Sequence, residues 1–189
     1  METLTTVAMG LGLAAAAGFR VFVPLLAAGI AARAGQVHLA TSFAWLSTTP
    51  ILLSLGIATV LEVVAYYVPW LDHALDLVAT PAAVAAGIVS SAAVFTDTPP
   101  AVKWVLAIIG GGGVAGMVQG ATVLARVKST ALTGGLGNPV ISSAELIGAA
   151  LTVVFALLIP VFTLLLLAAG CFLIFRASGR VVFGRRHGN

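Results

Sequence analysis

The sequence predicts an all-α membrane protein, a polytopic transmembrane helical bundle of about six spans. Three observations lead to this prediction. Of the 189 residues, 60% are hydrophobic and only 8% are charged, with a mean hydropathy of +1.15, whereas soluble domains carry about 25% charged residues. The apolar residues form runs near the ~20 residues that a helix needs to cross a bilayer. Basic residues gather after the last run, which is typical of a cytoplasmic end and not of a nucleic-acid site.

Six apolar segments form a single expected transmembrane domain, residues 1–176, with spans at about 3–33, 50–68, 81–96, 101–125, 139–159 and 160–176. The first segment is long and contains Arg20 and Pro24, so we expect it to be broken or kinked near its middle. One helix over 139–176 would overrun the bilayer, which favours two spans that divide at Pro160.

Three of the expected spans begin at a short polar residue followed by proline. These pairs are Thr49-Pro50, Thr80-Pro81 and Asn138-Pro139. A polar N-cap followed by proline at the first helical position is a helix start signal. The sequence therefore predicts that these three helices begin at their prolines.

Lysine and arginine counts predict the orientation. With six spans, the inner side receives Arg126, Lys128 and the arginines of the C-terminal end, which continues as a basic cytoplasmic tail over 177–189. The outer side receives only Arg33 and Lys103. This asymmetry follows the positive-inside rule and predicts a multi-pass protein with a cytoplasmic C-terminus.

A weak internal repeat relates the two halves of the chain. Arg33, Pro50 and Pro69 recur as Arg126, Pro139 and Pro160. Three spans in each half would make the second half inverted relative to the first, as in many secondary transporters. Chance similarity between Ala/Leu/Val-rich segments is the alternative, and both interpretations remain open.

Polar side chains inside the apolar segments are the first candidates for function. Glu62 and Gln119 lie well inside their spans, Glu145 lies about two turns into the fifth, and Arg20 is central in the first. An ionisable group there costs roughly 2.5–3.5 kcal/mol on insertion scales, so it normally faces a bundle interior or water. We expect these four residues to line a substrate or ion path, with Arg20 paired to Glu62 or Glu145 or bound to an anionic substrate. Interhelical hydrogen bonds that only fix the packing are the alternative.

The run Thr133–Pro139 is a second candidate, as an anion site or gate. Its residues Gly134, Gly135, Gly137 and Asn138 permit close approach to a ligand and precede a helix start. Arg126 and Lys128 lie just upstream and would add positive potential. An ordinary cytoplasmic loop is an equal alternative.

Other patterns are less specific. Asp72 and Asp76 share a helix face and could hold a divalent cation, but a solvated interfacial helix is the preferred interpretation. Tyr66, Tyr67 and Trp70, just before them, fit an aromatic belt at the membrane interface. Gly112, Gly116 and Gly120 form a stripe that suits close helix packing within one subunit or between subunits of a homo-oligomer.

Five strings resemble the bacterial membrane family catalogued as domain of unknown function 4126: Gly18–Pro24, Glu62–Asp72, Ala79–Ala83, Val118–Thr122, and Lys128–Thr130 followed by Thr133–Pro139. The resemblance extends over roughly residues 3–175 and implies a small polytopic protein of the bacterial inner membrane. It implies no particular activity, so no functional residue is transferred from it.

The sequence as a whole favours a transporter or channel for a small solute or ion in the lipid bilayer. A non-transporting scaffold that packs through the glycine stripe is the first alternative, and a lipid-modifying enzyme built on Asp72 and Asp76 is the second. The full sequence contains no HExxH, catalytic-triad or metal-ligand spacing, so an enzyme is not favoured. No cofactor is expected.

Overall fold

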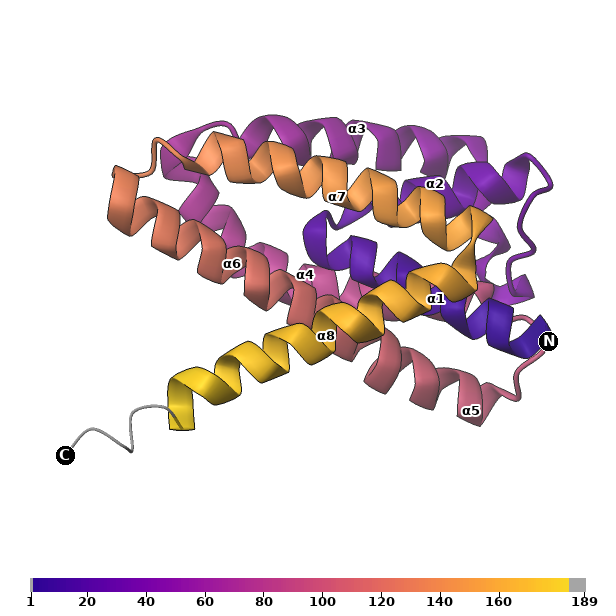
Figure 1. Cartoon of the computed structure of the whole chain (residues 1–189). Coiled ribbons are helices and arrows are strands. Elements are labelled where there is room, and N and C mark those ends of the chain that lie inside the picture. The colour runs from indigo at the N-terminus through magenta and orange to yellow at the C-terminus, as the bar shows by residue number, and fades with distance from the viewer. Residues whose placement is uncertain (1, 184–189) are drawn as a thin grey trace.

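The computed structural model describes residues 2–183, with side chains apart from those of residues 2, 69–76, 171 and 173–183. The described chain is all-helical (Figure 1). Its elements are α1 (Glu2–Phe19), α2 (Phe22–Arg33), η1 (Thr41–Ser47), α3 (Thr49–Ala65), α4 (Pro69–Val94), α5 (Pro100–Val105), η2 (Leu106–Gly112), α6 (Gly113–Thr133), α7 (Asn138–Leu158) and α8 (Pro160–Phe183).

Helix α1 is the centre of the bundle. It contacts α4, α6, α7 and α8, and the run from Leu13 to Ala17 is fully buried. A Cβ atom on Gly12 would lie 2.6 Å from the Cβ of Ala156, and one on Gly18 would lie 2.5 Å from the carbonyl oxygen of Ala115. The small residues of α1 therefore allow other helices to approach its backbone closely.

The chain reverses direction between α1 and α2. Gly10 in α1 lies against Phe95, and Ala40, beyond the end of α2, donates its N–H to the carbonyl of Ala93 at 2.7 Å. Residues on both sides of the break thus reach the same end of α4. The expected break is confirmed, but residues 3–33 form two short helices that fold back on each other instead of one kinked span.

The helix starts agree only in part with their signals. Pro50 and Pro139 lie in the first turns of α3 and α7, although no side-chain hydrogen bond caps either helix. The start at Thr80-Pro81 is wrong, since Pro81 lies inside α4. That helix begins at Pro69, where the preceding Val68 is extended, as residues before proline prefer to be.

Helices α5, η2 and α6 form one continuous segment with a π-helical turn over Leu106–Gly112. Glycines Gly112 and Gly116 face Ile88 and Val84 of α4, while Gly120 has open space beside it. Most of the glycine stripe therefore packs within the chain. Helix α6 continues to Thr133, so the segment after residue 125 is helical and not the expected loop.

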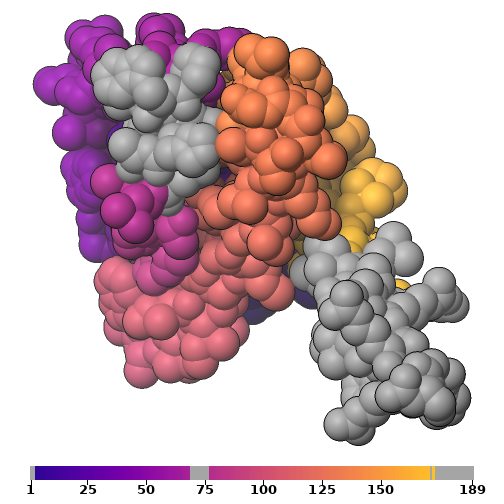
Figure 2. All heavy atoms as spheres, turned by 90° about the vertical axis from the view of Figure 1, so that its left-hand side faces the viewer, coloured from indigo at the N-terminus to yellow at the C-terminus, as the bar shows by residue number. Residues whose placement is uncertain are grey.

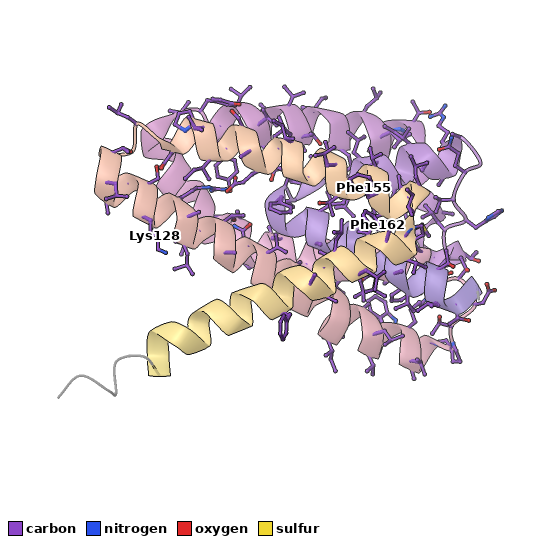
Figure 3. All side chains as sticks on the ribbon, in the orientation of Figure 1. Lys128, Phe155 and Phe162 are labelled. Atoms are coloured by element: carbon purple, nitrogen blue, oxygen red, sulfur yellow. The ribbon has the colours of Figure 1, made fainter. Side chains whose placement is uncertain are left out.

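Residues 139–176 divide into two helices, as expected. Helix α7 ends at Leu158 and α8 begins at Pro160. Phe155 and Phe162 pack edge to face across this junction, with ring centroids 6.0 Å apart (Figure 3). Proline at the start of α8 has no N–H to continue the preceding helix, which explains the division.

Three helices in the described chain are long and apolar enough to cross a membrane: Leu77–Val94, Pro100–Thr133 and Asn138–Leu158. A fourth is added if η1 and α3, which are bent by 65°, count as one span. Large apolar side chains are exposed on the outer faces, including Leu53 at 64% and Ile109 at 72%. Long apolar helices with exposed apolar faces are typical of a membrane protein.

Candidate functional site

Four ionisable side chains are buried together, and we call them the charge cluster: Arg20, Glu62, Arg126 and Glu145. Their exposed fractions are 1%, 8%, 2% and 4%. They come from the α1–α2 break, α3, α6 and α7, so residues far apart in sequence meet at one place. Two positive and two negative groups balance, which is how buried charges are normally tolerated.

Arg126 and Glu145 form the strongest contact of the cluster. The Nε of Arg126 donates to Oε1 of Glu145 at 3.0 Å, and its Nη2 donates to Oε2. This is the two-point geometry in which a guanidinium binds a carboxylate most strongly. The pair joins α6 to α7 inside the bundle. Arg126 was expected to add positive potential to the loop at 133–139, and the ion pair places it elsewhere.

Arg20 extends the cluster from the α1–α2 break to α7. Its Nη2 donates to the carbonyl oxygen and to Oγ of Ser142, at 2.8 and 2.6 Å, and lies 3.5 Å from Oε2 of Glu145. Its Nε and Nη1 are buried and have no hydrogen-bond partner. Arg20 thus pairs with Glu145, one of its two expected partners, and keeps unused donors.

Tyr66 lies under both guanidinium groups. The Cζ atoms of Arg20 and Arg126 are 4.3 and 4.2 Å from the centroid of its ring. These are cation–π distances, and the ring face favours positive charge. Tyr66 is only 3% exposed, so its assignment to an aromatic belt is wrong. Its neighbour Tyr67 is 44% exposed and contacts Oγ of Ser143 at 2.8 Å.

Glu62 caps the start of α2. Its Oε1 accepts the N–H of Val21 at 2.8 Å, and its Oε2 accepts the N–H of Phe22 at 3.2 Å. These N–H groups are unpaired at any helix start, and a carboxylate there complements the positive end of the helix dipole. Arg20 was expected to pair with Glu62 or with Glu145, and the carboxylate of Glu62 instead joins α3 to the backbone of α2.

Gln119 lies on the inner face of α6, two turns before Arg126. The other buried members of this face are Ala115 and Thr122. Gln119 is 2% exposed, and its Nε2 is buried without a hydrogen-bond partner. Gln119, like Arg20, therefore has buried donors without a partner.

The run Thr133–Pro139 is a compact turn. Gly134 and Gly135 have positive φ angles of 62° and 92°, which favour glycine. Oγ1 of Thr133 accepts the N–H of Gly137 at 2.9 Å, and Nδ2 of Asn138 donates to Oγ1 of Thr130 at 3.1 Å. The polar groups of the turn thus bind one another, which favours a structural loop over an anion site.

This turn lies at one end of the bundle, which Figure 2 shows end-on. Lys128 points outward from α6 there (Figure 3), and it is exposed. The side chains of Asp72 and Asp76 lie outside the described residues, so neither the solvated face expected there nor the alternative of a metal site is tested. The described residues include no group of three or more His, Cys, Asp or Glu side chains that could hold a metal ion.

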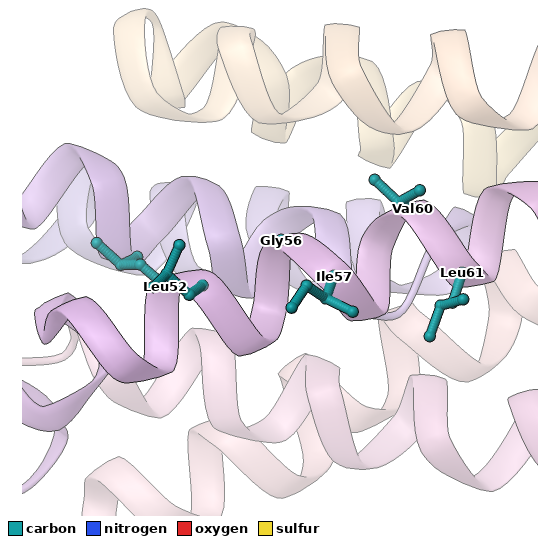
Figure 4. A pocket seen from close by; sticks show the side chains of 6 residues that line it. Leu52, Gly56, Ile57, Val60 and Leu61 are labelled. Carbon is teal, nitrogen blue, oxygen red and sulfur yellow. The ribbon is translucent and has the colours of Figure 1, made fainter.

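A shallow apolar groove runs along the outer face of α3. Its lining residues are Leu52, Leu53, Gly56, Ile57, Val60 and Leu61 (Figure 4). A groove lined only by apolar residues on an exposed helix face suits contact with lipid chains. It contributes no polar group to the candidate site.

Sequence reasoning missed the roles of Arg126, Tyr66 and Ser142. Two signals could have identified Arg126 and Ser142. Arg126 and Glu145 lie at similar distances from the turn at 134–137, so a helical hairpin places them at the same level. Ser142 lies three residues before Glu145 and therefore shares its helix face.

Comparisons of this chain with curated proteins and with solved structures returned no match. The family comparison matched residues 7–180 to the family described as "Domain of unknown function (DUF4126)". The match covers nearly the whole bundle and includes every residue of the charge cluster. The chain therefore belongs to the DUF4126 family.

Proposed function

We propose that this protein is a transporter or channel that carries a small solute or ion across the membrane through the charge cluster. The α1–α2 hairpin supports this proposal most directly, because its tip at Arg20 and Val21 ends inside the bundle on charged groups. Broken helices whose polar ends lie within the membrane occur where protein or a water-filled path surrounds them. In transporters, such half-helix ends form the solute and ion sites.

The proposal includes an arrangement in the membrane. Helices α3, α4, α7 and α8 cross it, together with the continuous α5–α6 segment, while the α1–α2 hairpin enters and returns on one side. This makes five crossings and a re-entrant hairpin instead of six spans. Lys128 and the basic C-terminal tail then share one side, which the positive-inside rule assigns to the cytoplasm. The N-terminus lies at the opposite end of the bundle (Figure 1).

The depth of the cluster follows from helix geometry. Glu145 lies about two turns after Asn138, the first residue of α7. At 1.5 Å per residue this is roughly 10 Å from the cytoplasmic end, or about a third of a ~30 Å hydrocarbon core. Helix α1 reaches this level from the other side. A solute that enters from the cytoplasm would therefore meet the cluster first and the hairpin behind it.

The moving part in this proposal is the hairpin tip. Polar contacts join it to α3 through Glu62 and to α7 through Ser142 and Glu145. A rearrangement of these few contacts would open the path on one side while the remainder of α1 stays packed. The inverted repeat remains part of the proposal. The α1–α2 hairpin of the first half would correspond to α6 of the second half, although only α6 belongs to a segment that crosses the membrane.

Flux through liposomes that contain the purified full-length protein tests this proposal. Light scattering after an osmotic jump reports entry of glycerol, urea and the potassium salts of chloride, acetate and phosphate. We expect at least one of these to enter faster than into protein-free liposomes. Arg20→Lys and Glu62→Gln should reduce that flux about tenfold or more, while Arg33→Gln and Asp97→Asn, at exposed positions, leave it unchanged. Flux at the protein-free rate, or equal flux in all variants, would overturn the proposal.

A non-transporting scaffold is the second candidate, and Gly120 is the observation in its favour. Its open side would allow another helix, including one from a second copy of the chain, to approach α6. Gly112 and Gly116 are already covered by α4. If Gly120→Leu disrupts a stable complex in detergent while flux is absent from the wild type, the scaffold is the better assignment.

A further inference from the structure

We propose that the solute is an anion, and that Arg20 and Gln119 together bind a compact oxyanion such as a carboxylate or phosphate group. This inference rests on the proposed function, because it names the class of solute that the charge cluster accepts. It comes from the hydrogen-bonding balance of the buried side chains.

The unpaired polar atoms in the described part of the interior are all donors. Among the described residues, the buried side-chain nitrogen and oxygen atoms without a partner are Nε and Nη1 of Arg20 and Nε2 of Gln119. Arginine carries five N–H groups, and the amide of glutamine carries two on its nitrogen. Since Nη2 of Arg20 binds Ser142, three N–H groups remain on Arg20 and two on Gln119. No acceptor oxygen is left over in the same set.

This imbalance selects the chemistry of the ligand. Buried polar groups without partners are rare and costly, and they mark places where another group completes the structure. Metal cations and ammonium groups offer no acceptor, so they cannot satisfy these N–H groups. A hydroxyl would bring a further donor of its own. A carboxylate or phosphate supplies only acceptors, and guanidinium groups match its oxygens in pairs.

The charges of the cluster point to the same class. Both oxygens of Glu62 accept backbone N–H groups of α2, and both oxygens of Glu145 are held by Arg126. Arg20 only shares Glu145, at 3.5 Å. Arg20 therefore shares its carboxylate partner with Arg126. A bound anion would give the Arg20 guanidinium a carboxylate or phosphate partner of its own.

The packing of α1 against α6 places the two donor residues at one level. A Cβ on Gly18 would meet the carbonyl of Ala115 and the side chain of Val118. Arg20 is two residues after Gly18 in the sequence. Gln119, which is buried in α6, is the residue after Val118. Small residues at this contact bring the two backbones together, so one small ligand would be in reach of both side chains.

The experiment measures ligand-induced thermal stabilisation of the full-length protein in lipid nanodiscs. Potassium phosphate and potassium acetate are titrated against potassium chloride at constant ionic strength. We expect saturable stabilisation by phosphate or acetate beyond that of chloride. Equal stabilisation by all three salts, or a rise that does not saturate, would overturn the inference.

Variants assign the effect to the two residues. Gln119→Leu keeps the approximate shape and removes two buried N–H groups, so the protein without ligand should be at least as stable as the wild type. Its affinity for the stabilising anion should fall about tenfold or more, which corresponds to about 1.4 kcal/mol. Arg20→Lys keeps the charge, loses the planar fork and should show a similar loss. Gln119→Met serves if the leucine variant misfolds.

Arg33→Lys is the matched control, because Arg33 is exposed and donates to Oγ1 of Thr49 at 2.8 Å; its affinity should equal that of the wild type. Unchanged anion affinity in both Gln119→Leu and Arg20→Lys would overturn the inference. Flux of glycerol or urea that depends on Arg20 and Glu62, without anion binding, would overturn the inference and leave the proposed function standing. Saturable anion binding that requires both residues, without flux of any solute, would support the site and overturn transport.

Discussion

Arg126 and Glu145 form a buried two-point ion pair across the α6–α7 hairpin, each a little over two helical turns from the loop that joins the helices. Glu145 also lies 3.5 Å from Nη2 of Arg20. One carboxylate thus holds two arginines, one from the end of α1 and one from α6. This makes Glu145 the centre of the charge cluster, although Glu62 and Arg20 are the more conspicuous residues in the sequence.

Removal of one partner from this pair should destabilise the fold strongly. Arg126→Met keeps the approximate length of the side chain but removes the guanidinium that binds both carboxylate oxygens of Glu145. Loss of one member of a buried pair costs about 3–5 kcal/mol, so we expect a clear fall in the midpoint of thermal unfolding in detergent. Lys128→Met removes the same charge from an exposed position of the same helix and should change the midpoint little. Equal midpoints for the two variants would show that the pair contributes nothing to stability.

Glu62→Gln should loosen the start of α2. The glutamine amide has only one acceptor oxygen, so its NH₂ group would face the N–H of Val21 or Phe22. An unpaired buried donor costs about 1–3 kcal/mol. We expect faster hydrogen exchange in peptides that cover residues 20–25, measured by mass spectrometry. Peptides from the α7–α8 junction provide the internal reference and should be unaffected. Unchanged protection at 20–25 would contradict the capping role.

Glycines of the two central helices should respond oppositely to alanine. A Cβ on Gly18 would lie 2.5 Å from the carbonyl oxygen of Ala115, so Gly18→Ala must push α1 from α6 and should cost about 1–3 kcal/mol. Gly120 has open space and a helical backbone, so Gly120→Ala should stabilise the protein by about 0.5–1 kcal/mol. Unfolding midpoints of the two variants and the wild type decide this. A destabilised Gly120→Ala variant that also loses an oligomer would instead indicate an interface at Gly120.

Helices and polar interior positions could be predicted from the sequence because both depend on local patterns. Long apolar runs fix the helical segments, and Arg20, Glu62, Gln119 and Glu145 were identifiable since polar groups in such runs are costly. All four proved to be buried. The partners could not be predicted in the same way. Glu62 binds the backbone of α2 only because the chain reverses at Arg20, and no periodicity records that reversal.

Competing local signals explain the other differences. Thr80-Pro81 has the polar N-cap signal, but α4 begins at Pro69, which follows the apolar Val68, and Pro81 lies inside the helix. Arg126 was counted as a loop charge because apolar residues become sparse after Ala125, yet α6 continues until Gly134 takes a positive φ angle. Tyr66 and Tyr67 are adjacent aromatic residues with opposite environments. Both lie in the turn between α3 and α4. The conformation of that turn decides which one enters the charge cluster, and the sequence alone did not fix it.

The α1–α2 hairpin also determines where the N-terminus lies, and this is testable in cells. With a re-entrant hairpin and five crossings, Thr3 and Gln36 lie on the outer side and Lys128 on the inner side. With six spans, Thr3 would share the inner side with Lys128. Each position is exposed at an end of the bundle, so a cysteine placed there can react with a thiol reagent.

Single-cysteine variants Thr3→Cys, Gln36→Cys and Lys128→Cys, each in a Cys171→Ser background, separate the two arrangements. Cys171 is the only cysteine in the sequence, so this background is free of other thiols. A membrane-impermeant reagent applied to intact cells should label positions 3 and 36, whereas position 128 should react only after permeabilisation. Gln36→Cys is the control, since both arrangements place it outside. Labelling of position 36 with protection of position 3 would contradict the hairpin, because the first apolar segment would then have to cross the membrane.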